Sequence, residues 1–230
     1  MPVGAVLVAA GRGRRFGAGG PPKQFRSLNG RPLFHWPLRV LERTPAVTAI
    51  VMVVPQDRRL WTDRYLKRAG FKKVVAVVPG GAERFDSVRA GLRALPGPCD
   101  LVLVHDAARA LVTRPVVDRV IRAARRTGAA LAAWPVPDTI KEGVQRAGRW
   151  SVRRTVPRSG LWLAQTPQGF RRTETRAFFE MTGPLTDDVQ ALERSGRPVE
   201  IVRGSADNFK VTLPEDFDLC RRLLTARKDR

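Results

Sequence analysis

The feature that most constrains the fold of this sequence is a regular alternation of short apolar runs with amphipathic segments. The runs are rich in β-branched residues, as is typical of strands buried on both faces, and the segments between them carry apolar residues at helical spacing. Strands separated by helices in this way pair in parallel, and the helices cover both faces of the sheet. The predicted strands are residues 3–9, 47–54, 73–78, 101–105 and 129–136, and the predicted helices are residues 32–43, 57–68, 83–95 and 115–126.

We therefore predict an α/β fold, a single domain over residues 1–230 with a twisted, mostly parallel, Rossmann-like sheet. A chain of 230 residues fits one large α/β domain, and its 43% content of hydrophobic residues is enough for a sizeable core. Ligands of such sheets bind at the carboxyl ends of the strands, so we expect the site in the loops that follow them.

Residues 137–157 interrupt the alternation. The turn-like stretches at residues 141–143 and 148–149 favour a pair of polar extended strands over a crossover helix, so we predict a protruding β-arm here. After the arm, the pattern predicts strands at residues 161–165 and 199–202, helices at residues 172–181, 187–195 and 214–225, and a frayed tail at residues 226–230.

The apolar runs are too short for a membrane protein. The longest, residues 5–10 and 74–78, fall far below the roughly 18 residues that a membrane-spanning helix needs. No basic segment precedes the first apolar run, which argues against a secretory signal. We expect a cytoplasmic protein with no membrane partner.

Cysteine and histidine usage excludes several kinds of chemistry. Cys99 and Cys220 show neither CxxC spacing nor a nearby histidine cluster, and His35 and His105 are the only histidines. A zinc site, a disulfide framework and a serine-histidine-aspartate triad are all disfavoured. We expect both cysteines to be buried thiols.

The charge balance allows two interpretations. The 42 Lys and Arg residues against 21 Asp and Glu residues give a formal net charge of +21. A nucleic-acid-binding protein usually concentrates such charge in a tail, a stripe or a patch, whereas here arginines occur in nearly every segment. We favour a solvated basic surface, and a polyanionic partner remains the alternative.

The loop after the first predicted strand has the composition of a phosphate-binding loop. It lacks the GxxxxGK string of a P-loop, and Phe16 stands where a dinucleotide fingerprint needs its third glycine. The small residues of the loop still allow the backbone to approach phosphates closely, and cations follow them. The alternative is a basic surface loop. The candidate residues are Ala9, Ala10, Gly11 and Gly13, with Arg15 and Lys23 as the cations.

Several motifs together resemble one family. They are AAGRGRRF at residues 9–16, PKQ at residues 22–24, VLVHDAAR at residues 102–109 and DNFKVTLPED at residues 207–216. This combination resembles the 2-C-methyl-D-erythritol 4-phosphate cytidylyltransferases of the non-mevalonate isoprenoid pathway. The likeness covers residues 6–224, in the family's order, and implies a fold like that of nucleotide-diphospho-sugar transferases.

The resemblance implies a reaction in which a phosphate oxygen of the acceptor attacks the α-phosphorus of CTP and pyrophosphate leaves. It assigns Arg15 and Lys23 to stabilising the charge that develops on the triphosphate, with Mg²⁺ bridging the oxygens. Asp106, at the carboxyl end of the fourth strand, is the expected metal ligand. A capping aspartate is the alternative for that residue.

The resemblance also implies residues for the base, the sugar and the acceptor. A loop at residues 80–88 faces the cytosine and ribose, and an arm that crosses a homodimer completes the partner's site. Without the resemblance, Arg158 is one surface arginine among many. The residues assigned in this way are Gly81, Ala82 and Ser87 to CTP, Ala107, Arg109, Thr166 and Thr186 to the acceptor pocket, Lys210 and Arg158 to the acceptor phosphate, and Thr139 to the arm.

Three alternatives to this function can be tested. A ribitol 5-phosphate cytidylyltransferase shares the fold and the triphosphate loop. A basic nucleic-acid-binding protein on the same scaffold should bind DNA or RNA of any sequence, with an affinity that falls steeply with salt. A nicotinamide-dependent reductase would need the missing third glycine.

Overall fold

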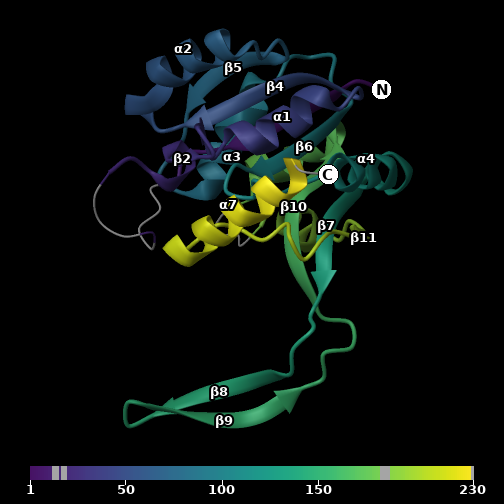
Figure 1. The fold of residues 1–230 in the computed structure, drawn as a ribbon. Helices are drawn as coiled ribbons and strands as arrows, with labels where there is room; N and C mark the ends of the chain where they lie inside the picture. The colour runs from purple at the N-terminus through teal and green to yellow at the C-terminus, as the bar shows by residue number, and fades with distance from the viewer. Residues whose placement is uncertain (12–15, 17–19, 182–186, 229–230) are drawn as a thin grey trace.

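The computed structural model describes residues 1–11, 16, 20–181 and 187–228. Its centre is a seven-stranded sheet with the order β11-β7-β10-β6-β1-β4-β5, in which β10 is antiparallel to both of its neighbours and every other pair is parallel (Figure 1). The mostly parallel α/β sheet predicted from the sequence is confirmed. The strands are β1 (Val3–Val8), β4 (Val47–Val54), β5 (Val74–Pro79), β6 (Leu101–Asp106), β7 (Ala129–Pro135), β10 (Trp162–Arg171) and β11 (Glu200–Arg203).

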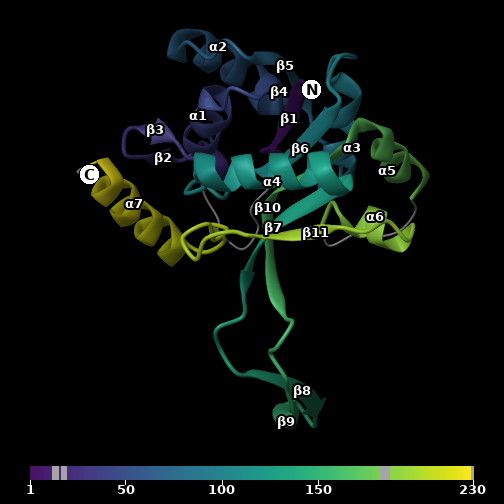
Figure 2. The ribbon, with the colours of Figure 1, turned by 90° about the vertical axis from the view of Figure 1, so that its right-hand side faces the viewer.

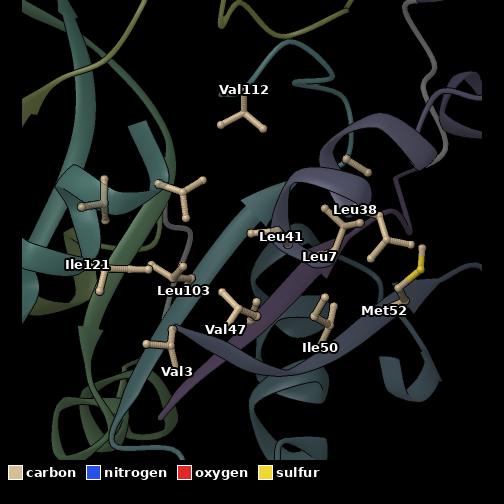
Figure 3. Close-up of a cluster of buried hydrophobic side chains, with 14 of the residues drawn as sticks. Val3, Leu7, Leu38, Leu41, Val47, Ile50, Met52, Leu103, Val112 and Ile121 are labelled. Atoms are coloured by element: carbon tan, nitrogen blue, oxygen red, sulfur yellow. The ribbon is translucent and has the colours of Figure 1, made fainter. Parts of the chain in front are cut away.

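Helices cover both faces of the sheet because each central strand is apolar on both sides. Along β1, Val3 and Leu7 point into the cluster beneath one helical layer, whereas Val6 belongs to the cluster on the opposite face (Figure 3). Figure 2 shows α4 running along one of these faces. The first layer is built from α1 (His35–Arg43), α2 (Arg59–Ala69) and α4 (Arg114–Thr127), and the second from α3 (Arg84–Ala94), α5 (Arg176–Glu180) and α6 (Gln190–Arg194).

The predicted arm is present as a two-stranded antiparallel hairpin. Strands β8 (Ile140–Arg146) and β9 (Arg149–Val156) are joined by a turn in which Ala147 and Gly148 have positive φ angles of 48° and 75°. The hairpin projects away from the body of the molecule (Figure 1). Trp150 on β9 is 73% exposed. Val152 on the same strand is 66% exposed, so the hairpin carries two large apolar side chains in solvent.

The structure corrects several predicted boundaries. The strand predicted at residues 161–165 continues to Arg171, with an irregularity in register between Ala164 and Gln168. Residues 31–32 belong to a small hairpin, so α1 begins only at His35. The helix predicted at 172–181 divides into a 3-10 helix and α5, and the one predicted at 187–195 is shortened to α6. The small hairpin consists of β2 (Ser27–Leu28) and β3 (Arg31–Pro32).

The predicted fraying from residue 226 onward is also wrong for residues 226–228. Helix α7 (Pro214–Lys228) includes them because the Arg227 guanidinium donates hydrogen bonds to the Leu111 carbonyl at 2.8 Å and to the Asp207 carboxylate at 3.1 Å. The two cysteines are buried and unpaired, as predicted. Within the described residues, no helix combines the length and the apolar character needed to cross a membrane.

Candidate active site

The loop after β1 is folded back on itself by one side chain. Gln24 is buried, and its Nε2 donates hydrogen bonds to the carbonyl oxygens of Ala9 at 2.5 Å and Gly11 at 2.6 Å. The start of the loop, which follows β1, and the Lys23–Phe25 turn are thereby held together, and Lys23 precedes the glutamine that bonds to the loop. Of the predicted loop residues, Gly13 and Arg15 lie outside the described part of the chain.

The loop after β5 lies against the loop after β1. A Cβ atom on Gly80 would come within 2.2 Å of the Ala10 Cβ and 2.7 Å of the Ser87 Oγ, so only glycine allows this approach. The Gly81 N–H donates to Ser87 Oγ at 3.2 Å, and Ala82 is exposed. The two segments predicted to bind CTP are therefore neighbours at the same edge of the sheet.

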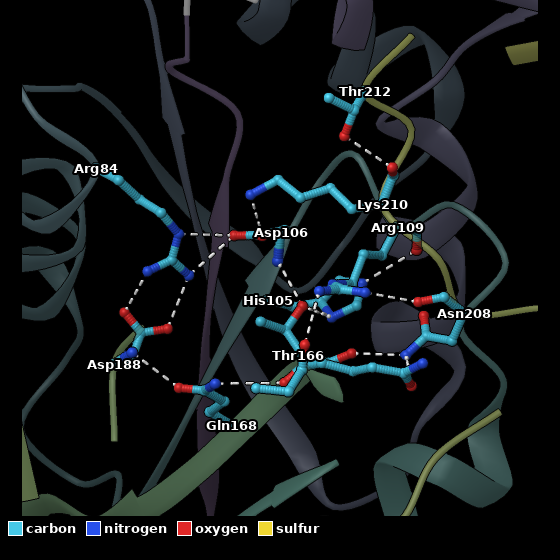
Figure 4. Close-up of polar contacts among 12 residues, drawn as sticks. Arg84, His105, Asp106, Arg109, Thr166, Gln168, Asp188, Asn208, Lys210 and Thr212 are labelled. Atoms are coloured by element: carbon cyan, nitrogen blue, oxygen red, sulfur yellow. Dashed lines mark hydrogen bonds and ion pairs between the residues drawn. The ribbon is translucent and has the colours of Figure 1, made fainter. Parts of the chain in front are cut away.

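A buried carboxylate lies between two cations at the end of β6. The Asp106 Oδ1 is 2.9 Å from Arg84 Nη2 and accepts a hydrogen bond from Arg84 Nε, and its Oδ2 is 2.8 Å from Lys210 Nζ (Figure 4). Burial opposes ionisation, but the positive charges of Arg84, Lys210 and Arg109 outweigh it and hold the pKa of Asp106 well below its usual range. Asp106 forms ion pairs and is not a helix cap, so the capping alternative is wrong.

Arg84 links this carboxylate to a second one. Its Nη1 and Nη2 donate to the two carboxylate oxygens of Asp188 at 2.7 Å and 2.8 Å, a fork-to-fork pair, and Asp188 is fully buried (Figure 4). Burial lowers the pKa of Arg84, but the charges of Asp106 and Asp188 outweigh it and raise this pKa above its ordinary value. In turn, Gln168 Oε1 accepts hydrogen bonds from the backbone N–H groups of Asp188 and Val189.

A short chain of hydrogen bonds fixes His105 beneath Asp106. The His105 Nε2 lies 3.3 Å from the Arg109 carbonyl oxygen, which can only accept, so the ring proton sits on Nε2. The Thr166 hydroxyl then donates to His105 Nδ1 at 2.9 Å and accepts the Asp106 backbone N–H at 3.0 Å. Thr166 therefore orients the end of β6 and keeps His105 in one neutral tautomer.

This arrangement predicts a loss of stability in mild acid. Burial lowers the pKa of His105 from 6.5 to about 4. Above pH 6.5 the imidazole is neutral in both the folded and the unfolded chain. Between pH 6.5 and about 4, only the unfolded chain takes up the proton. The His105 contribution to the free energy of unfolding, roughly 3 kcal/mol from the size of this shift, is thus lost as the pH falls through that window.

Two measurements check this expectation. Urea unfolding between pH 7 and pH 4 should show the free energy of unfolding falling with pH, and the NMR signal of the His105 ring should titrate with a midpoint of about 4. His35, whose pKa is also lowered to about 4, acts in the same direction and needs a separate assignment. A His105 ring that titrates near 6.5 would contradict the proposed hydrogen-bond chain.

The C-terminal motif packs against the loop after β6. The Val211 N–H donates to the Ala108 carbonyl at 2.9 Å, while the Ala107 N–H donates to the Val8 carbonyl at 3.0 Å. Arg109 donates to the carbonyl oxygens of Asn208 at 2.8 Å and Ala164 at 3.1 Å. These contacts bring Lys210 over Asp106, although the two residues lie far apart in the sequence.

Comparisons with known proteins identify the family of this site. The family model for 2-C-methyl-D-erythritol 4-phosphate cytidylyltransferase (IspD) matches residues 3–226. The chain belongs to this family. A cytidylyltransferase of that name from Pelotomaculum thermopropionicum is 43% identical over 234 residues, which cover 99% of this chain and 96% of the relative. The crystal structure of 2-C-methyl-D-erythritol 4-phosphate cytidylyltransferase from Thermus thermophilus aligns with a TM-score of 0.77 and 33% identity, covering 98% of this chain and 100% of that one.

Some IspD relatives are longer. The bifunctional enzyme IspD/IspF of Desulforudis audaxviator is 45% identical over 225 residues, and the match covers 96% of this chain but 56% of the relative. This chain therefore spans little more than half the length of that relative. The resemblance drawn from the sequence motifs is confirmed, and the chain is a member of a nucleotidyltransferase family.

The structure brings most of the predicted IspD residues together at one edge of the sheet, but not all. Thr139 and Arg158 lie at the base of the arm, where Arg158 donates to the Pro137 carbonyl of its own chain, and Thr186 lies outside the described residues. Sequence reasoning missed Arg84 and Asp188. Arg84 lies within residues 80–88, the segment assigned to the cytosine and ribose, and this was the signal that could have found it. Nothing in the sequence links Arg84 to an acid 104 residues away.

The residues of this IspD site are compatible with a metal ion that takes most of its ligands from a substrate. No group of three or more His, Cys, Asp or Glu side chains able to hold a metal occurs in the part of the chain that the structure describes. Mg²⁺ commonly uses one or two carboxylates, with phosphates and water as its other ligands. Asp106 fits that role if Lys210, whose side chain is 39% exposed, moves from Oδ2.

Proposed function

We propose that this chain transfers a cytidylyl group from CTP to 2-C-methyl-D-erythritol 4-phosphate and releases pyrophosphate. An acceptor phosphate oxygen forms the new bond to the α-phosphorus of CTP, and the bond from that phosphorus to the β-phosphate oxygen breaks. The observation that carries the proposal is the convergence of Lys210 and Arg84 on Asp106, next to the end of β1 from which the glycine-containing loop starts. Two anions must meet in this reaction, so neutralising their charge is the main requirement of the site.

The triphosphate is proposed to lie on the loop after β1. Backbone groups of Ala9, Ala10, Gly11 and Gly13 approach the phosphates, while Arg15 and Lys23 stabilise the charge on the leaving pyrophosphate. The fold of the loop by Gln24 supports the placement of Lys23. The cytosine and ribose are proposed to face Gly81, Ala82 and Ser87 in the adjoining loop.

The acceptor is proposed to lie on the Lys210 side of the cluster. The Lys210 ammonium attracts the acceptor phosphate, with Ala107, Thr166 and Thr186 lining the pocket. Arg109, which is hydrogen-bonded to two carbonyl groups, fixes the Asn208 segment and adds positive potential.

We also propose that the reaction uses Mg²⁺ held by Asp106 together with phosphate oxygens. When bound, the ion neutralises phosphate charge. The ion pairs of Asp106 keep its carboxylate charged, as a metal ligand must be. We further propose a cytoplasmic location, which two unpaired buried thiols favour.

Pyrophosphate release tests the proposed function. We expect release only with CTP among the four ribonucleoside triphosphates, only with a divalent ion, and fastest with methylerythritol phosphate. Faster release with ribitol 5-phosphate would favour that alternative, and salt-sensitive binding of DNA or RNA without pyrophosphate release would favour the nucleic-acid-binding alternative.

We propose a homodimer in which Thr139 and Arg158 of one subunit complete the site of the other. The projecting β8–β9 hairpin and the exposed Trp150 support this arrangement, because Thr139 and Arg158 flank the hairpin, which extends away from the body that contains Asp106. Mixing inactive Arg158→Ala and Lys210→Ala proteins should then restore part of the activity, since a hybrid dimer regains one intact site.

Activity after mixing and refolding the two variants together checks this prediction, with each variant refolded alone as the control. At equal amounts, half of the dimers are hybrids by random pairing, and each has one intact site. A mixture no more active than the separate variants would show that the arm does not act across subunits.

A further inference from the structure

A basic cavity lies on the α1 side of the molecule. It has a volume of about 470 Å³ and is bounded by α1, the β2–β3 hairpin and the turn after α2. None of its lining residues belongs to the cluster around Asp106, and Figure 2 shows α1 beside the β2–β3 hairpin. The lining residues that matter here are Arg31, His35, Trp36, Arg39, Arg43 and Phe71.

The arginines of this cavity carry positive charge that the protein leaves uncompensated. In the described part of the chain, none of the ion pairs involves Arg31, Arg39 or Arg43. Arg39 and Arg43 are four residues apart on α1, so they share a helix face and repel each other. Like charges held around a concave surface favour a bound anion.

The one acidic residue in the lining is already engaged. Glu42 accepts hydrogen bonds from the backbone N–H groups of Lys72 at 2.8 Å and Lys73 at 3.1 Å, which anchors the start of β5. Even with the charge of Glu42 counted, the three arginines leave a positive excess. That excess suits a ligand with two or more negative charges.

The wall of the cavity next to the arginines is neutral and aromatic. The Tyr65 hydroxyl lies 2.8 Å from His35 Nδ1 and is also hydrogen-bonded by Arg31, so it donates its proton to the imidazole. The His35 ring is 5.2 Å from Phe71 and 5.7 Å from Trp36, in edge-to-face contacts, and Trp36 Nε1 donates to the Leu28 carbonyl. These contacts hold the aromatic rings in place before any ligand binds.

We propose that this cavity binds a nucleoside phosphate at a site separate from the catalytic centre. Guanidinium groups pair with phosphate oxygens in a planar, bidentate geometry, which Arg31, Arg39 and Arg43 can supply. The rings of Trp36 and Phe71 are each partly exposed and line the cavity, so they give the base aromatic carbon to contact. The volume lies within the range of sites that bury ligands of nucleotide size.

Calorimetric titration with ADP tests the proposal. ADP carries a purine, so it is a poor match for the proposed cytosine loop and reports mainly on the α1 cavity. We expect wild-type protein to bind ADP and the double variant R39Q/R43Q to bind it at least tenfold more weakly. Inorganic pyrophosphate should bind at least tenfold more weakly than ADP, because it lacks the base, and adenosine should not bind detectably.

A matched double variant separates a specific site from the general charge of the protein. Arg122 and Arg222 are exposed, lie outside the cavity and are replaced in R122Q/R222Q, which removes the same two charges. ADP affinity should stay within twofold of wild type there. If the double R39Q/R43Q does not fold, the single variants R39Q and R43Q serve in its place.

Four results would overturn the proposal. They are no ADP binding by the wild-type protein, equal weakening in the two double variants, unchanged affinity in R39Q/R43Q, and pyrophosphate binding as tight as ADP binding. Pyrophosphate release from CTP should be unaffected in R39Q/R43Q. The proposed catalytic function and this second site can therefore fail independently of each other.

Discussion

Replacing Lys23 by alanine is expected to lower kcat by roughly 10²–10³-fold, the effect typical of removing one preorganised group that stabilises transition-state charge. Lys23 belongs to the turn that Gln24 ties to Ala9 and Gly11, so its ammonium is proposed to meet the leaving pyrophosphate. The charge on that group grows as the bond to the α-phosphorus breaks. The loss should therefore appear in kcat more than in the KM for CTP.

Steady-state pyrophosphate release checks this, with urea unfolding to show that the variant is folded. Lys67→Ala is a suitable control, because Lys67 pairs with Asp63 on the exposed side of α2, and its replacement removes the same charge away from the site. The control should keep wild-type turnover. Near-normal kcat in Lys23→Ala would remove Lys23 from the proposed mechanism.

The central strands could be predicted from the sequence because they are short apolar runs, and β1, β4 and β6 are buried along almost their whole length. Residues 47–54 were predicted with the bounds that β4 has, since this strand is buried along almost its whole length. Strand β10 was predicted too short because Pro167 and Gly169 are typical of a turn. In the fold, β10 pairs antiparallel with β6 on one side and β7 on the other, and the strand includes both residues.

The site could be predicted only where its residues belong to short motifs at strand ends. Gly81 and Asp106 follow predicted strands, and Ser87 lies in the first turn of the helix after Gly81, so the topology brings them to one edge of the sheet. The pairing of Arg84 with Asp188 depends on how α3 packs against a segment 104 residues later. Local spacing contains no information on such a contact.

Asp188→Asn is expected to lower the free energy of unfolding by roughly 3–5 kcal/mol, the range for removing one partner of a buried ion pair. The side chain of Asp188 is fully buried and holds Arg84 through two short hydrogen bonds. Asparagine has nearly the same size as aspartate but carries no charge. Its amide NH₂ group would face an N–H group of Arg84, so two hydrogen-bond donors would oppose each other. Arg84 then retains Asp106 as its sole acidic partner among the described residues.

Urea unfolding of Asp188→Asn and Asp207→Asn checks this expectation. Asp207 pairs with Arg227 at 3.1 Å and is 47% exposed, so its replacement should cost no more than about 1 kcal/mol. Arg84→Met combined with Asp188→Asn should be less destabilising than the sum of the single changes, because the two residues interact directly. Equal losses in the two aspartate variants would show that the buried pair contributes no more than a surface one.

The same substitution has a second expected effect, at Asp106. In Asp188→Asn, Arg84 has lost its other acidic partner and pairs with Asp106 alone, so it competes more strongly with a divalent ion for that carboxylate. CTP turnover in Asp188→Asn should therefore need a higher divalent-ion concentration, whereas Asp207→Asn should keep the wild-type requirement.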